Sequence, residues 1–229
     1  LGTLGVVTRA VFRLHPLPHH ARSFTIAAAN PEETQKLVLT IQDSKLGHVA
    51  LQAHFSAEST PTIDILFEGT EAGLDTQATQ LRSLCRSAQI AEASPAVWDA
   101  RQTLWSLSNA AETTIAKISF LPIDLARTIE LFRRATDPHR LPWNALIYAT
   151  GLGWLHLKDA PENTHLALAS LRSDLEKMSG SLLLLHRPAN LQTLDAWGTP
   201  GDSLPLMKAI KHQLDPANTL NPGRFLGGI

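Results

Sequence analysis

Hydrophobic and polar positions along this chain follow the same order twice. In each copy, an alternating stretch typical of a strand precedes a helical spacing, two more alternating stretches and a second helical spacing. The first copy predicts strands over 23–29, 49–55 and 62–67, and helices that begin at Pro31 and span 71–86. The second copy predicts strands over 113–120, 144–149, 154–157 and 181–186, and helices that begin at Pro122 and span 161–178. The pattern repeats, although the amino acids themselves do not.

Each copy reads β-α-β-β-α, and a closing strand is clear only in the second. Asn30 is placed to cap the first helix, and Gly180 is placed to end the last helix of the repeat. This order is the split βαβ, or ferredoxin-like, arrangement, in which helices cover one face of an antiparallel sheet. The sequence therefore predicts an α+β fold with two ferredoxin-like halves, at about 22–90 and 110–187.

The segments outside the two copies have patterns of their own. Between the copies, a helix predicted from Pro95 carries Trp98 and Trp105 on one face. These side chains are interpreted as a hydrophobic anchor between the halves, and a pocket wall is the alternative. The remaining pattern predicts a strand over 6–14, a loop over 188–201 and a final helix over 203–214.

Composition narrows the class of protein. Hydrophobic residues make up 44% of the 229 positions, enough for a substantial core, and the formal net charge of −1 leaves no basic surface for nucleic acid. No apolar run is long enough to cross a bilayer, and residues 1–16 lack the layout of a signal peptide. The single cysteine, Cys85, lies on the apolar stripe of a predicted helix, so we expect it to be buried. A cytoplasmic protein is expected, with peripheral attachment to the inner face of the membrane through partners as the alternative.

Several common catalytic motifs are absent from the sequence. There is no phosphate-binding loop ending in Gly-Lys-Ser/Thr, no nucleophile elbow and no paired-histidine zinc motif. His15, His19 and His20 are close together, but no acidic residue or cysteine stands beside them to complete a metal site. No metal site is therefore predicted.

Two short stretches, one near each end, have the character of ligand-binding loops. In "GTLGVVT", Gly2 and Gly5 would let backbone N–H groups approach a bulky anionic ligand closely. In "NPGR", the proline is expected to hold Asn221 extended, and Pro222-Gly223 suits a type II turn. This turn would present Asn221 and backbone amides outward, with Arg224 beside them.

Together and in this order, "GTLGVVTRAVFRLHPLP" and "LMKAIKHQLDPANTLNPGRF" resemble the FAD-linked oxidase family of the vanillyl-alcohol-oxidase type. With "LDAWG" ahead of it, the second stretch is most similar to the FAD-binding subunit of bacterial glycolate oxidase, and "VWDARQTLW" resembles a stretch of the same family. The resemblance implies FAD as the cofactor and a cap domain built from an antiparallel sheet with helices on one side. The cofactor-binding residues that it implies are Gly2, Thr3, Gly5, Val6, Val7, Asn221, Pro222, Gly223 and Arg224.

The resemblance also implies a domain plan. Residues 1–18 would be the tail end of a FAD-binding domain, 19–200 the cap or substrate domain, and 201–229 a helix and loop that return to the FAD domain. In the family, the main pyrophosphate loop lies upstream of the region that this chain matches. This piece alone is therefore expected not to retain FAD and to be inactive.

The implied activity is oxidation of glycolate, D-lactate or a similar 2-hydroxy acid by hydride transfer to the flavin. Such a reaction needs a group that takes the hydroxyl proton and a group that binds the carboxylate. On a strand in "GLGWLHLK", Trp154, His156 and Lys158 share one face, which makes His156 the candidate base and the other two candidate substrate contacts. A half-exposed sheet face with a solvated lysine is the alternative. Arg187 is a second candidate anion binder, with an ordinary surface role as its alternative.

Two other classes of function remain open. One is a non-catalytic electron-transfer or structural subunit of a complex like glycolate oxidase, whose implied partners are a second flavin subunit and an iron–sulfur subunit. The other is a small-molecule-binding module made of tandem ferredoxin-like units, which would be a complete, independently stable domain.

Overall fold

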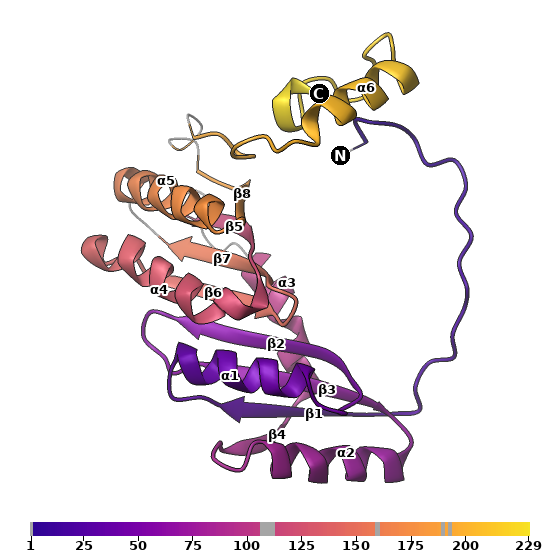
Figure 1. Cartoon of the computed structure of the whole chain (residues 1–229), viewed down its shortest axis with the longest axis vertical. Coiled ribbons are helices and arrows are strands. Elements are labelled where there is room, and N and C mark those ends of the chain that lie inside the picture. Colours follow the sequence, from indigo (N-terminus) through magenta and orange to yellow (C-terminus); the bar gives the residue numbers. More distant parts are fainter. Residues whose placement is uncertain (1, 106–112, 159–160, 189–190, 192–193) are drawn as a thin grey trace. The chain divides into compact units, whose positions relative to one another are not determined.

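The computed structural model describes residues 2–105, 113–158, 161–188, 191 and 194–229 (Figure 1). The chain divides into two compact units. Residues 18–196 form the larger unit, which is called the sheet unit below. Residues 1–17 and 197–229 form the smaller one, which is called the terminal unit and contains helix α6 (Leu204–Leu214) and the short helix η5 (Leu226–Gly228).

The sheet unit contains the two predicted copies of the β-α-β-β-α pattern, each completed by a closing strand. The first half comprises β1 (His20–Ala27), α1 (Pro31–Gln42), β2 (His48–Ser56), β3 (Thr62–Gly69), α2 (Glu71–Leu84) and β4 (Ile90–Ala93). The second comprises β5 (Thr113–Ser119), η2 (Pro122–Asp124), α4 (Leu125–Thr136), η3 (Asp137–His139), β6 (Trp143–Tyr148), β7 (Leu152–Lys158), α5 (Pro161–Lys177) and β8 (Ser181–His186). Between the halves lie η1 (Pro95–Asp99) and α3 (Ala100–Trp105).

The eight strands of the described residues form one antiparallel sheet, in the order β4-β1-β3-β2-β6-β7-β5-β8. Each half has the strand order of a ferredoxin-like unit, and the halves meet where their second strands, β2 and β6, pair with each other. The predicted fold class is confirmed: α+β, with an antiparallel sheet built from two ferredoxin-like halves.

The four longer helices of the sheet unit cover one face of the sheet (Figure 1). Phe24 and Ile26 of β1 face this helical side, as do the alternating apolar residues of the other strands, and they form one continuous core with α1, α2, α4 and α5. Helix α1 begins as predicted, because the Asn30 side chain accepts a hydrogen bond from the backbone N–H of Glu33 at 2.8 Å. Among the described elements, η1 and α3 lie on the opposite face, which has none of the four longer helices and is called the helix-free face below.

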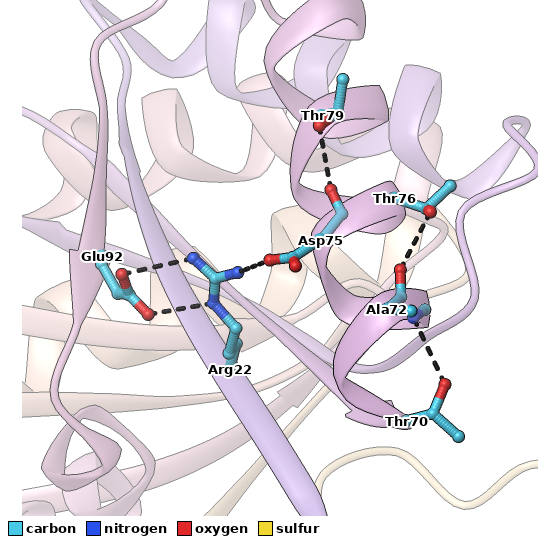
Figure 2. Close-up of polar contacts among 8 residues, drawn as sticks. Arg22, Thr70, Ala72, Asp75, Thr76, Thr79 and Glu92 are labelled. Carbon is cyan, nitrogen blue, oxygen red and sulfur yellow. Dashed lines mark hydrogen bonds and ion pairs between the residues drawn. The ribbon is translucent and has the colours of Figure 1, made fainter.

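An ion-pair network ties the outer strands of the first half to helix α2. Arg22 of β1 donates to the carboxylate of Glu92 on β4 at 3.0 and 3.4 Å, and to that of Asp75 on α2 at 2.8 Å (Figure 2). This fork-like arrangement uses the planar geometry of the guanidinium group. It holds the short strand β4, which the sequence pattern did not reveal, against β1.

The strand predicted over 6–14 is wrong. These residues have no strand structure, and the side chains of Val7, Val11 and Phe12 are 85%, 91% and 81% exposed. The β-branched composition suits a strand, but a strand also needs a neighbour to pair its backbone groups. Within the part of the chain that the structure describes, none pairs with this segment.

Candidate functional site

In the terminal unit, the buried side chain of Lys211 joins the N-terminal segment to the loop that follows α6. Lys211 is 7% exposed, and its Nζ donates to the carbonyl oxygen of Thr3 at 2.8 Å and to that of Leu220 at 2.7 Å. Its third partner is Asp215 Oδ2, one helical turn further on, at 2.6 Å. All three donors of the ammonium group are therefore used, and residues 208 positions apart are held together.

Asp215 organises the loop between α6 and the Asn-Pro-Gly turn. Its Oδ1 accepts from both the backbone N–H and the hydroxyl group of Thr219, at 2.9 and 2.8 Å, and its Oδ2 accepts from the N–H of Leu220 at 2.8 Å. The Lys211 ammonium group, together with these donors, holds the pKa of Asp215 well below its usual range. Sequence reasoning missed both residues, although a Lys–Asp pair at i, i+4 directly before a proline was a usable signal.

Of the predicted cofactor-binding residues, the structure brings one from each end of the chain into direct contact, Gly2 and Asn221. Asn221 Nδ2 donates to the carbonyl oxygen of Gly2 at 3.4 Å, and Thr3 is buried beside Lys211. Gly5 lies next to Leu214 of α6, while Val6 and Val7 are exposed.

The Asn-Pro-Gly turn forms as predicted, with one difference. The N–H of Arg224 donates to the carbonyl oxygen of Asn221 at 3.4 Å, and Gly223 has a φ of 74°, as a type II turn requires. The prediction that the proline holds Asn221 extended is wrong, because Asn221 has a φ of 43°. Asparagine tolerates this left-handed region better than most residues, and this overrides the usual preference of a residue before proline. Pro222, Gly223 and Arg224 are exposed, so the backbone of the turn is open to a ligand.

In the sheet unit, Trp154, His156 and Lys158 of β7 share the helix-free face, as the alternation predicts. They do not share an environment. Trp154 is 3% exposed, because its ring packs against Tyr148 at 5.0 Å between centroids and lies under the guanidinium group of Arg101 at 4.6 Å. Lys158, at the end of the strand, is exposed.

His156 lies between these two and is partly buried. Burial lowers the pKa of its imidazole, and the positive charge of Lys158 lowers that pKa further. Both effects favour the neutral ring, which can accept a proton. The β7 face therefore offers a neutral base next to a cation.

Arg187 lies apart from this group. It follows β8, and β5 separates β8 from β7 in the sheet. Its guanidinium group donates to the carbonyl oxygen of Leu194, so one of its donors serves the local loop.

The sheet unit also carries two hollows that the sequence did not reveal, and the first lies on the helix-free face. One, of 780 Å³, contains a hydrogen-bonded pair of His54 on β2 and Asp64 on β3. The other, of 390 Å³, is lined by Trp98, Tyr148 and the beginning of β2. The sequence signal for the first was a short run of polar residues at alternate positions, Gln52, His54 and Ser56 on β2 and Thr62 and Asp64 on β3.

The described helices include none with the length and apolar character that a membrane crossing needs. In the same part of the chain, no three His, Cys, Asp or Glu side chains come together in a way that could hold a metal ion.

Comparison with known proteins gives one family match. A family described as "FAD linked oxidases, C-terminal domain" matches residues 199–225, the stretch that holds Lys211, Asp215 and the Asn-Pro-Gly turn. That description names FAD as the cofactor of the family. No match was found among curated proteins.

Solved structures share the fold. p-Cresol methylhydroxylase with substrate bound is similar over 93% of this chain and 54% of its own, with 15% identity and a TM-score of 0.66. Alkyldihydroxyacetonephosphate synthase is similar over 98% of this chain and 48% of its own, with 14% identity and a TM-score of 0.64. Xylooligosaccharide oxidase from Myceliophthora thermophila C1, in complex with xylobiose, is similar over 86% and 53%, with 16% identity and a TM-score of 0.52.

This chain spans about half the length of each of these proteins. At such low identity, the likeness shows the fold alone. The chain therefore shares the fold of these solved structures, and residues 199–225 match the family of FAD-linked oxidase C-terminal domains, in agreement with the resemblance noted in the sequence.

Proposed function

We propose that this chain is the C-terminal cap part of a FAD-dependent oxidoreductase subunit that oxidises glycolate, D-lactate or a similar 2-hydroxy acid. The observation that carries the proposal is the junction at Lys211. It joins the glycine-rich N-terminal segment to the same loop that matches the FAD-linked oxidase family.

The terminal unit fits contact with FAD. A Cβ added to Gly223 would meet no atom within 4 Å, and the backbone around it is exposed, so a flat, bulky group has room to lie against the turn. The C-terminal side of this contact would come from Asn221, Pro222, Gly223 and Arg224. The N-terminal side would come from Gly2, Thr3, Gly5, Val6 and Val7. When bound, FAD supplies the hydride acceptor.

The β7 face supports the choice of a 2-hydroxy acid. His156, kept neutral by burial and by Lys158, has the protonation state that accepting a hydroxyl proton requires. The exposed ammonium group of Lys158 would bind the substrate carboxylate, and Arg187 is a second candidate for that role. Trp154 would hold this part of the face in place, because its buried ring packs against the guanidinium group of Arg101.

The test compares the whole protein that contains this chain with the 229-residue chain alone. We expect flavin absorbance in the first and none in the second, and anaerobic bleaching of the whole protein by glycolate or D-lactate. A whole protein that neither contains nor takes up FAD would refute the flavin proposal. One that holds FAD but is not reduced by any 2-hydroxy acid would refute only the substrate.

The second candidate function is an electron-transfer or structural subunit of a complex like glycolate oxidase. The burial of Trp154 favours it, because one of the two expected substrate contacts on β7 is already in the core. In this case the protein would act with a second flavin subunit and an iron–sulfur subunit in the cytoplasm. Reduction of the flavin by substrate would then require those partners, and adding them would restore it.

A further inference from the structure

A hollow of 780 Å³ lies on the helix-free face of the sheet unit. Its floor is formed by strands β1, β2, β3 and β6, and one wall by η1 and α3. A volume of this size is within the range of small-molecule sites in proteins. None of Trp154, His156 and Lys158 lines it, so it is separate from the β7 face described above.

The charged centre of this hollow is Asp64, whose side chain is 4% exposed. Its Oδ1 accepts the hydroxyl hydrogen of Thr25 at 2.6 Å, and its Oδ2 lies 2.7 Å from His54 Nε2 and 3.3 Å from Gln52 Nε2. Burial by itself would raise the pKa of Asp64, but the bonds from His54, Thr25 and Gln52 outweigh it and lower that pKa. Asp64 is therefore a carboxylate that accepts from three donors.

These contacts fix the tautomer of His54. Gln52 Nε2 lies 3.0 Å from the carbonyl oxygen of Val97, 3.3 Å from Asp64 Oδ2 and 3.2 Å from His54 Nε2. The much shorter contact of 2.7 Å between His54 Nε2 and the carboxylate needs a hydrogen between them, so the amide hydrogens of Gln52 go to the two oxygens. His54 Nε2 must then carry a hydrogen and donate it to the carboxylate. In the neutral ring the other nitrogen, Nδ1, is a hydrogen-bond acceptor, and among the described residues it has no partner. The side chain is 32% exposed, so a ligand can reach it.

The lining of the hollow is polar but contains little charge. Hydroxyl and amide groups come from Thr60, Thr62 and Asn144, whose side chains hydrogen bond to no described residue. Leu104 and Leu146 add apolar surface. Of the described residues that line the hollow, none is Lys, Arg or Glu, and the Asp64 carboxylate disfavours an anion. These groups match a neutral molecule with several hydroxyl groups, which both donates to and accepts from its site.

We propose that this hollow is a binding site for an uncharged polyhydroxylated molecule, a polyol or a small sugar, in which His54 Nδ1 accepts a hydrogen bond from a ligand hydroxyl group. Asp64 positions the ring and keeps its acceptor nitrogen toward the ligand. This site is distinct from the β7 group of the proposed flavin chemistry, because none of Trp154, His156 and Lys158 lines the hollow.

The experiment uses the intact chain with D-xylose and glycerol as neutral probes and D-lactate as an anionic one. Long-range ¹H–¹⁵N spectra of the imidazole rings report on each histidine, and calorimetry gives the affinity. We expect D-xylose to shift His54 Nδ1 in a saturable way and to leave His156 unchanged, while D-lactate produces no saturable shift of His54.

Substitutions complete the test. His54→Phe keeps a ring of similar shape without the acceptor, and we expect D-xylose to bind about tenfold more weakly, as for the loss of one hydrogen bond. Thr62→Val removes a lining hydroxyl group and keeps the side-chain shape, so it tests the site even if His54→Phe fails to fold. His156→Gln is the matched control and should leave the affinity unchanged. Absence of saturable binding of either neutral probe, preference for D-lactate, or equal weakening by His156→Gln would overturn the proposal.

Discussion

The charge of the Asp215 side chain contributes to the stability of the terminal unit. Its pKa lies well below the ordinary value of an aspartate, about 3.9, because Lys211 and the amides of Thr219 and Leu220 all favour the carboxylate. A carboxyl group with a lowered pKa in the folded state stabilises that state above the unfolded pKa. This stabilising contribution is lost as the pH falls from about 4 toward the pKa that Asp215 has in the folded state. The terminal unit should therefore loosen in acid before its carboxylates become fully protonated.

Asp215→Asn should reproduce this loosening at neutral pH. The amide keeps the size of the side chain but removes its charge, and it leaves the buried Lys211 ammonium group without its counter-ion. We expect the amide hydrogens of Thr219 and Leu220 to exchange with solvent about tenfold faster. Hydrogen exchange followed by NMR measures this directly. Asp202→Asn, at an exposed position of the same unit, is the control; equal exchange rates in the two variants would contradict the role of Asp215.

The His156 imidazole makes a second prediction at this scale. Burial is the larger reason for its lowered pKa and Lys158 the smaller, so its titration midpoint should lie below the ordinary value of about 6.5. Lys158→Gln should move that midpoint upward, but only part of the way, because the burial remains. In folding terms, a histidine with a lowered pKa destabilises the folded state as the pH falls below the unfolded value. NMR titration of the ring protons provides the measurement, with Lys36→Gln on the exposed side of α1 as the control; an unchanged midpoint in Lys158→Gln would remove the proposed coupling.

At the scale of elements, the turn between β6 and β7 requires glycine. Gly151 has a φ of 80°, and a Cβ placed on it would lie 2.0 Å from the carbonyl oxygen of Phe120. Backbone strain and overlap with a backbone atom act together, so Gly151→Ala should lower the free energy of unfolding by about 3 kcal/mol or more. Gly47→Ala, where the added Cβ would meet no atom within 4 Å, should change it by about 1 kcal/mol at most. Chemical denaturation of both variants gives the comparison, and similar losses would show that Gly151 is not under this constraint.

The elements also show what could be predicted from the sequence. Helices such as α4 were visible because one face must be apolar to join the core, and that requirement leaves a regular spacing. Strand β4 (Ile90–Ala93) was not visible, because none of its residues is fully buried and its place depends on pairing with β1 and on Arg22. The strand predicted over 6–14 failed for the opposite reason, because its residues suit a strand but no described strand pairs with them. Strand pairing is non-local, and a single segment does not encode it.

The candidate sites also differ in how much of each could be predicted from the sequence. The face shared by Trp154, His156 and Lys158 followed from simple alternation along one strand. The contact between His54 and Asp64 depends on the register of β2 against β3, so the two polar residues could not be paired from the sequence. Lys211 and Asp215 were within reach of sequence reasoning as an i, i+4 pair, but Thr3, to whose carbonyl oxygen Lys211 also donates, lies at the other end of the chain.

At the scale of the whole molecule, the two halves of the sheet unit share one core. Strands β2 and β6 continue the sheet across the junction, and Gln35 of α1 accepts from the backbone N–H of Ala126 in α4 at 2.9 Å. Apolar residues from both halves belong to the same buried cluster. Although the fold repeats, we therefore expect the sheet unit to unfold in a single cooperative transition and not half by half.

Substitutions in opposite halves test this cooperativity. Phe24 of β1 is 1% exposed and Phe132 of α4 is 0% exposed, so Phe24→Ala and Phe132→Ala should each lower the free energy of unfolding by about 3–5 kcal/mol. If the halves are one unit, each variant shifts the same single transition, and circular dichroism and tryptophan fluorescence report the same midpoint. Phe12→Ala, at a side chain 81% exposed, should change the stability by no more than about 0.5 kcal/mol. Two separate transitions, with each variant moving only its own, would mean that the ferredoxin-like halves fold independently and that the junction between β2 and β6 contributes little to their stability.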